Sequence, residues 1–188
     1  MTICCLDTET TGLEPINSGP FELGFLIYEK GLLIEERVFH LNPLNEEVLI
    51  HPEALEVNGV TEEQIRSYPP AGEIVPEIVK FLQNHTPPEK LVLLAYNAPF
   101  DYGHLGGLFF RCGFNMNDYF NGRLIDVLEL VKKAKDKNLL PSTRDNKLGT
   151  IVKALGIEQG KAHTALDDIR ATRQIYETIY MIERKGRI

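Results

Sequence analysis

The chain has 188 residues, 43% of them hydrophobic, and a formal net charge of −7 at pH 7. Its length and apolar content fit one globular domain over residues 1–188, while the acidic balance argues against tight nonspecific binding to duplex nucleic acid. Because no apolar stretch is long enough for a signal peptide or a membrane span, we expect a soluble cytoplasmic protein without membrane partners.

The first half of the chain alternates apolar runs with turn-forming residues. Short connections between the first three runs predict an antiparallel meander of strands. Short and amphipathic helical segments follow, and Thr61 and Gln64 have the spacing of a helix capping box. The expected strands cover residues 2–6, 21–28 and 33–41, and the expected helices cover residues 51–57, 61–66 and 72–83.

The second half of the chain predicts a strand that is buried on both faces, followed mainly by helices. Residues 91–96 are nearly all apolar, as is typical of a strand in the middle of a sheet covered on both sides. The complete pattern predicts an α/β fold: a mixed five-stranded sheet, its first three strands antiparallel, covered by helices. The later elements expected are helices at residues 100–112, 126–137, 147–155 and 164–184, and a short strand at residues 123–125.

Two acidic residues follow the first apolar run, in the motif Leu6-Asp-Thr-Glu-Thr-Thr-Gly-Leu13. Adjacent side chains of a strand, such as those of Cys4 and Cys5, point to opposite faces, whereas side chains two apart share a face. We therefore expect both cysteines in the core, and Asp7 and Glu9 together in one site at the carboxyl edge of the sheet. An Asp-x-Glu pair alone is equally typical of a solvated surface, and the flanking residues favour the site.

A third carboxylate comes just after the buried strand, in the motif Tyr96-Asn-Ala-Pro-Phe-Asp101. Asp101 falls in the first turn of the next helix, where a negative charge stabilises the helix dipole by about 0.3 to 1 kcal/mol. The motif also contains Asn97, which can hydrogen-bond a nucleotide, and Phe100, which can stack on a base. A ligand site explains this combination better than helix stabilisation alone.

The last motif, His163-Thr-Ala-Leu-Asp-Asp168, contains two adjacent aspartates with different expected roles. Thr164 and Asp167 have the spacing of a capping box, so Asp167 is expected to stabilise the start of the last helix. Asp168 then faces another direction. His163 lies just before the helix, where it is free to reach a bound water.

The four carboxylates and the histidine indicate one chemistry. Carboxylates are hard oxygen ligands that suit Mg²⁺ or Mn²⁺, and a pair of such cations stabilises the attacking and leaving oxygens of a phosphoryl displacement. The ordinary pKa of histidine, about 6.5, lets it accept a proton from water near neutral pH. The residues therefore predict a hydrolase that cleaves phosphodiester bonds.

These motifs resemble those of the DEDDh 3′-to-5′ exonucleases, a family that includes the proofreading subunit of bacterial DNA polymerase III and several RNA-trimming enzymes. The resemblance covers nearly the whole chain. Phe21-Glu-Leu-Gly24 is similar to the second-strand signature of the family, and His51-Pro-Glu-Ala-Leu-Glu-Val-Asn-Gly-Val-Thr61 is similar to its helix-turn segment. The resemblance implies a ribonuclease H-like fold and a mechanism that uses two divalent cations.

The resemblance also implies a role for each site residue. Asp7 would bridge both cations, and His163 would be the general base. Two positions depart from the usual pattern, because Tyr96 and Asn58 stand where many members have histidine, and this puts substrate preference rather than activity in question. The expected cation ligands are Asp7, Glu9, Asp101 and Asp168, and the expected substrate contacts are Thr10, Leu13, Asn58, Asn97 and Phe100.

Several alternatives stay open. The leading expectation is a 3′-to-5′ exonuclease acting on single-stranded DNA and releasing nucleoside 5′-monophosphates, and the alternative is an exoribonuclease, because nothing reports how a 2′-hydroxyl is treated. An inactive exonuclease fold that binds other proteins is disfavoured by the intact set of five residues. An aspartyl-phosphate phosphatase is disfavoured because Glu9 replaces its second aspartate.

The expected partner is the 3′ end of a single-stranded nucleic acid, bound weakly and in a salt-sensitive way. A DNA polymerase or another replication protein could dock on the domain surface, and the sequence carries no signal for oligomeric state. Basic residues that could lie along the substrate path, or equally on a solvated surface, are Lys132, Lys133, Lys135, Lys137, Arg144 and Lys147.

Overall fold

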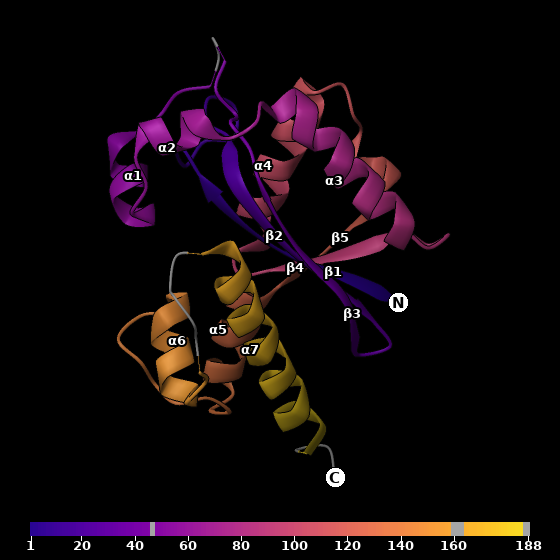
Figure 1. The fold of residues 1–188 in the computed structure, drawn as a ribbon. Helices are drawn as coiled ribbons and strands as arrows, with labels where there is room; N and C mark the ends of the chain where they lie inside the picture. Colours follow the sequence, from indigo (N-terminus) through magenta and orange to yellow (C-terminus); the bar gives the residue numbers. More distant parts are fainter. Residues whose placement is uncertain (46–47, 159–163, 186–188) are drawn as a thin grey trace.

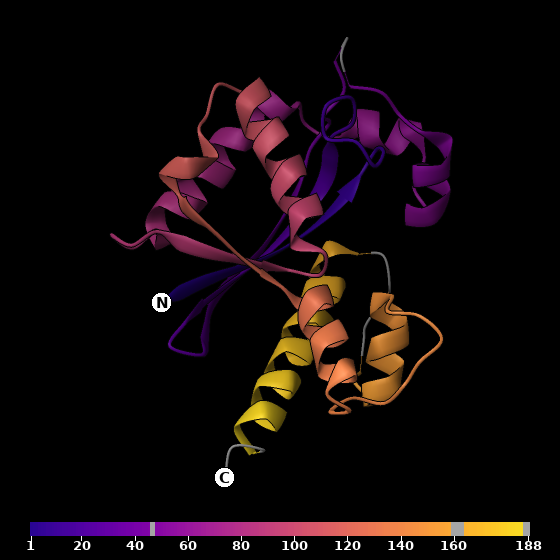
Figure 2. The ribbon, with the colours of Figure 1, turned by 180° about the vertical axis from the view of Figure 1, so that it is seen from behind.

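The computed structural model describes residues 1–45, 48–158 and 164–185. A five-stranded mixed sheet runs through the middle of the molecule with helices on both sides (Figures 1 and 2). The strands are β1 (Thr2–Thr10), β2 (Pro20–Glu29), β3 (Leu32–His40), β4 (Leu91–Ala95) and β5 (Phe120–Asp126); the helices are α1 (Pro52–Asn58), α2 (Glu62–Ser67), α3 (Ala71–His85), α4 (Ala98–Arg111), α5 (Val127–Asp136), α6 (Leu148–Leu155) and α7 (Ala165–Lys185), with a 3₁₀ turn, η1 (Met116–Asp118).

The order of strands across the sheet is β3-β2-β1-β4-β5. The first three strands form an antiparallel meander, and β4 and β5 add to it in parallel, each followed by a helix. This arrangement confirms the predicted mixed sheet. Among the described residues, no helix is long and apolar enough to cross a membrane.

The two faces of the sheet support two separate hydrophobic cores. On β1, Cys4 and Leu6 point to the core covered by α3 and α4, while Ile3 and Cys5 point to the core covered by α5, α6 and α7. The prediction that Cys4 and Cys5 face opposite sides is therefore confirmed, and both thiols are fully buried. Since β1 is central and apolar on both faces, its backbone is held in place over its whole length.

Local signals account for the ends of several helices. Thr61 and Gln64 form the predicted capping box at the start of α2, each side chain bonding the backbone of the other residue. Gly59 and Gly156 end α1 and α6 in the left-handed conformation, with φ of 65° in both cases, which glycine adopts without strain. These signals explain why the predicted boundaries agree with the structure to within a few residues.

The first strand is longer than predicted, and its additional residues include Asp7 and Glu9. The sequence indicated an end near Leu6, but β1 continues to Thr10 because β2 pairs with it along its whole length. The parallel partner β4 pairs only with Ile3, Cys4 and Cys5. Beyond Cys5, one edge of β1 is therefore open, and polar side chains can occupy the space between β1, the start of α4 and the start of α7.

Candidate active site

Three carboxylates meet where α7 begins beside β1. Asp7 and Glu9 lie two residues apart on β1, and Asp168 lies in the first turn of α7. One ligand oxygen from each of the three lies within 4.8 Å of the others, a spacing that allows all three to bind the same cation. Glu9 and Asp168 are buried and Asp7 is partly buried.

Asp101 approaches this carboxylate cluster from the other side of β1. It lies in the first turn of α4, is only 2% exposed, and accepts a hydrogen bond of 2.9 Å from the Thr8 hydroxyl. Thr8 stands between Asp7 and Glu9 on the strand, so its side chain points to the opposite face and meets α4. Asp101 is thus held beside the cluster by a residue that the sequence analysis did not single out.

The carboxylates repel one another electrostatically. Burial, followed by the charges of Asp101, Glu9 and Asp168, raises the pKa of Asp7 well above its ordinary value. Burial and the charges of Asp168 and Glu22 raise the pKa of Glu9 to about 7. Burial also raises the pKa of Asp101 to about 8, although the Thr8 hydrogen bonds oppose that shift.

Such a group of oxygen ligands fits a hard divalent cation. Buried carboxylates that repel one another stay protonated unless positive charge is brought among them. A bound cation removes the repulsion and reverses the local pKa shifts. The all-oxygen donor set is the kind that Mg²⁺ and Mn²⁺ prefer.

The adjacent aspartates of α7 point in different directions. Asp167 accepts a 3.3 Å hydrogen bond from the Thr164 hydroxyl and pairs with Arg170, also at 3.3 Å. Arg170 in turn pairs with Glu36 of β3. Asp167 therefore belongs to the surface at the start of α7, while Asp168 belongs to the carboxylate cluster.

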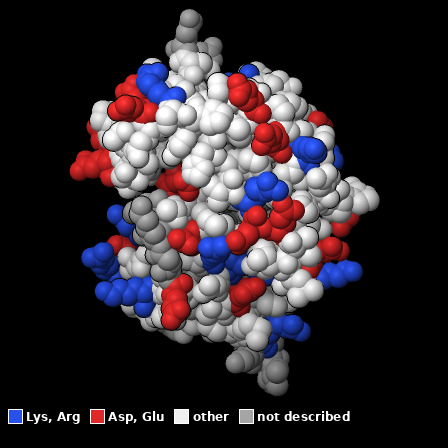
Figure 3. Space-filling model, in the orientation of Figure 1, with Lys and Arg blue, Asp and Glu red and all other residues white. Residues whose placement is uncertain are grey.

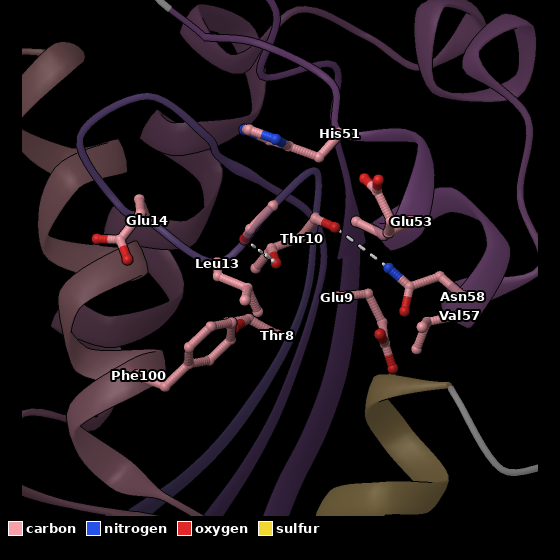
Figure 4. Close-up of a pocket in the computed structure, with 12 residues that line it drawn as sticks. Thr8, Glu9, Thr10, Leu13, Glu14, His51, Glu53, Val57, Asn58 and Phe100 are labelled. Carbon is pink, nitrogen blue, oxygen red and sulfur yellow. Dashed lines mark hydrogen bonds between the residues drawn. The ribbon is translucent and has the colours of Figure 1, made fainter.

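A pocket of about 620 Å³ opens next to the cluster. Figure 4 shows Leu13 and Phe100 close together on one side, while the Glu9 carboxylate points down toward the start of α7 on the other. Asn58 donates a 3.2 Å hydrogen bond to the Thr10 carbonyl and so attaches the end of α1 to β1. The lining comprises Thr8, Glu9, Thr10, Gly12, Leu13, Glu14, His51, Glu53, Ala54, Val57, Asn58 and Phe100.

A buried histidine, which the sequence patterns did not indicate, contacts two residues of the pocket wall. His104 of α4 is fully buried, its Nε2 donates to the Leu13 carbonyl at 3.3 Å, and its ring centroid lies 4.5 Å from that of Phe100. Burial lowers the pKa of His104 to about 4, so the ring is neutral at physiological pH. Its position one helical turn after Phe100 was the signal available in the sequence.

One expected substrate contact, Asn97, is not part of the pocket. Asn97 is exposed, takes a left-handed conformation with φ of 67°, and stands outside the pocket lining, with its backbone N–H bonded to the Asp126 carboxylate at 3.1 Å. His163 lies outside the residues that the structure describes. Tyr96 donates a 2.5 Å hydrogen bond to the Asn146 carbonyl and so attaches the loop before α6 to the end of β4.

Most of the basic residues considered for the substrate path have other partners. Lys132 pairs with Glu129 at 2.6 Å, Lys137 with Glu183 at 2.9 Å and Arg144 with Asp145 at 3.3 Å. Lys135 bonds polar atoms of the loop before α6, including Asn146 Oδ1 at 2.6 Å. Figure 3 shows acidic and basic side chains interspersed over the face that it presents.

Comparison with known proteins identifies relatives over nearly the whole chain. A family described as exonuclease (RNase_T) matches residues 4–176. The chain is 30% identical over 175 residues to a DNA polymerase III PolC-type from Thermotoga petrophila, covering 93% of this chain and 12% of the relative. It is 29% identical over 182 residues to the DNA polymerase III subunit epsilon of Pasteurella multocida, covering 93% of this chain and 66% of that protein.

Solved structures agree on the fold. The zinc-bound complex of Escherichia coli exonuclease I with single-stranded DNA superposes with a TM-score of 0.81 and 23% identity, covering 99% of this chain and 41% of that one. The described sheet and helices are thus those of a ribonuclease H-like exonuclease fold. The chain spans only part of each of these relatives.

Proposed function

Because the chain belongs to the exonuclease (RNase_T) family, we propose that it hydrolyses phosphodiester bonds from the 3′ end of single-stranded DNA and releases nucleoside 5′-monophosphates. The relatives support this choice, since they are a DNA polymerase III of PolC type, a DNA polymerase III subunit epsilon and an exonuclease bound to single-stranded DNA. The chain spans only about 12% of the length of its PolC-type relative from Thermotoga petrophila.

One observation carries the proposal: Glu9 belongs both to the carboxylate cluster and to the lining of the pocket. A terminal nucleoside in the pocket therefore places its phosphate beside the cluster. The pocket volume, about 620 Å³, lies in the range that accommodates small ligands of nucleotide size. Leu13 and Phe100 offer the apolar and aromatic surfaces on which bases stack.

We assign the site residues as follows. Asp7, Glu9, Asp101 and Asp168 hold divalent cations, Mg²⁺ or Mn²⁺, which supply charge neutralisation and an activated water. His163 accepts the proton of that water, an assignment that rests on the sequence motif. Glu9 and the Thr10 backbone hold the terminal 3′-hydroxyl, while Leu13, Phe100 and Asn58 contact the last nucleotides.

The arrangement also explains why an end is needed. Leu13 and Phe100 lie on the pocket wall and can pack only on a base that has left the helical stack of a duplex. A single strand presents such a base freely, whereas a duplex end has to fray first. We therefore expect single strands to be degraded faster than blunt duplexes.

The test uses matched linear and circular single-stranded DNA, a linear RNA of the same sequence and a blunt duplex, with Mn²⁺ present. We expect ladders from the linear DNA labelled at its 5′ end, mononucleotide products, and complete loss of activity with EDTA. Equal cutting of the circle would contradict an exonuclease, and activity in metal-free buffer would contradict the cation site. Faster cutting of RNA would instead make the domain an exoribonuclease.

A further inference from the structure

Gly24 of β2 lies directly under the start of α7. It is opposite Asp7 in the antiparallel pairing of β1 with β2. A Cβ atom at Gly24 would lie 2.8 Å from the carbonyl carbon of Ala165, 2.9 Å from its oxygen and 3.1 Å from its Cβ. Real Cβ atoms do not approach backbone this closely, so any side chain at this position would push the first turn of α7 away from the sheet.

Glu22, two residues earlier on the same strand, bonds the same turn of α7. Its Oε1 accepts a hydrogen bond of 2.8 Å from the backbone N–H of Ala165. The first N–H groups of a helix have no partner within the helix, and the Glu22 carboxylate supplies one. The other carboxylate oxygen accepts from His40 Nε2 at 3.1 Å, which holds Glu22 from the side of β3.

The position of this turn decides where Asp168 lies. Ala165 is fully buried, and Asp168 follows it by three residues, within the same turn. When Asp7, Glu9 and Asp168 are ionised they carry the same charge, so their repulsion acts to move the start of α7 outward. The close approach at Gly24 and the hydrogen bond from Glu22 act in the opposite direction.

We propose that Glu22 and Gly24 are positioning residues that hold the first turn of α7 on β2 and thereby keep Asp168 within binding distance of the cation that Asp7 and Glu9 share. This inference rests on the proposed function, because it concerns the assembly of the same cation site. Glu22 acts through the reach of its side chain to Ala165 rather than through its charge, since a further negative charge beside Asp7 and Glu9 adds to their repulsion. Gly24 acts by leaving room for the helix backbone.

Two variants of Glu22 distinguish the effect of its side-chain length from the effect of its charge. E22Q keeps an oxygen that can accept from the Ala165 N–H but removes the charge, whereas E22D keeps the charge on a side chain one methylene shorter. We expect E22Q to bind Mn²⁺ within about threefold of the unmodified protein. We expect E22D to bind it about ten- to a hundredfold more weakly, the usual effect of losing a residue that orients a ligand.

The measurement is Mn²⁺ binding to the full chain, by calorimetry or by electron paramagnetic resonance, without nucleic acid. H40A is the matched control, because it removes the second partner of Glu22 and leaves the bond to Ala165, and it should bind Mn²⁺ normally. G24A should bind Mn²⁺ as weakly as E22D does. Circular dichroism on each variant shows whether the fold is retained.

The outcomes distinguish three cases. If E22D binds normally and E22Q binds weakly, Glu22 acts through its charge or as a ligand, and the inference is wrong. If all Glu22 and Gly24 variants bind Mn²⁺ like the unmodified protein, α7 is held by other contacts and the inference is also wrong. If the unmodified protein binds no Mn²⁺, and D168N behaves identically, the proposed function itself fails.

Discussion

The carboxylate cluster and the pocket beside it are built in different ways. The cluster residues and the neighbouring Asp101 stand on β1, α4 and α7, elements that pack into the two hydrophobic cores. Much of the pocket is formed by the loop after β1 and by α1, a helix of seven residues none of which is buried. Leu13 and Val57 on these segments are 78% and 60% exposed.

For the proposed function, the cluster places the reacting groups and the pocket recognises the substrate. A carboxylate on a central strand cannot move without disturbing the cores, so the cluster is preorganised. The outer segments are attached by a few hydrogen bonds, such as that from Asn58 to the Thr10 carbonyl and that from the His51 N–H to the Thr11 carbonyl. Substitutions in the cluster should therefore change the rate of cleavage, and substitutions in the pocket should change affinity.

The largest expected effect comes from Asp168→Asn, which removes a charged ligand from the cluster. Transition-state stabilisation by bound cations is worth several kcal/mol, so we expect the rate of cleavage at saturating Mn²⁺ to fall by about a hundredfold or more. Single-turnover kinetics on single-stranded DNA measures the effect.

Asp167→Asn is the matched control for that substitution. Asp167 contacts Thr164 and Arg170 instead of the cluster, so its replacement should leave the rate within about twofold and cost at most about 0.5 to 2 kcal/mol of stability at the helix start. The reverse ranking of the two variants would show that the other aspartate faces the cluster.

A second prediction concerns the stability of the protein in EDTA as pH changes. Burial and mutual repulsion place the pKa of Glu9 at about 7 and that of Asp101 at about 8, and raise that of Asp7, all above their values of about 4 in an unfolded chain. The folded state binds these protons more tightly, so their contribution to stability is complete below pH about 4 and is lost as pH rises through about 7 to 8.

The expected loss is on the order of several kcal/mol between pH 5 and pH 8.5. Urea unfolding across this range measures it, and addition of Mn²⁺ at the alkaline end should restore the stability. A flat profile in EDTA would mean that the carboxylates stay apart when no cation is bound.

A third prediction addresses the pocket wall. Phe100→Ala should raise KM for single-stranded DNA about tenfold and change kcat little, because base stacking on an aromatic ring contributes about 1 to 3 kcal/mol. Phe110→Ala is the control, since Phe110 lies on the same helix, is 83% exposed and stands outside the pocket lining. An equal change in both variants would place the substrate elsewhere.

The smallest expected effect is that of Asn58→Ala. The hydrogen bond from Asn58 to the Thr10 carbonyl contributes about 0.5 to 1.5 kcal/mol, so its loss should raise KM by about two- to tenfold through movement of α1. Asn84→Ala, at an exposed position on α3, serves as the control and should behave like the unmodified protein. A fall in kcat with unchanged KM would show that α1 orients the reacting groups as well.

Much of the fold and part of the site follow from local patterns in the sequence. Alternation along β1 correctly predicts that Cys4 and Cys5 face opposite cores and that Asp7 and Glu9 share a side. The predicted length of β1 was wrong, because a polar stretch resembles the end of a strand when its pairing with β2 is unknown. The capping pattern of α7 predicts the different directions of Asp167 and Asp168.

Other features of the site depend on contacts between distant parts of the chain. Thr8 and Asp101 are 93 residues apart, and Glu22 and Ala165 are 143 residues apart. A glycine in a strand, such as Gly24, gives no indication in the sequence of the helix that will lie against it. Only the packed structure shows which segments approach so closely.

The sequence by itself therefore determined the elements, the residues capable of cation chemistry and the side of each element on which they lie. The tertiary structure decided that Asp101 meets the cluster through Thr8, that His104 supports Leu13 and Phe100, and that β2 carries the start of α7. The physical reason is that backbone geometry repeats locally and fixes the direction of a side chain relative to its own element. Which elements then touch depends on how the two cores pack, and that involves the whole chain at once.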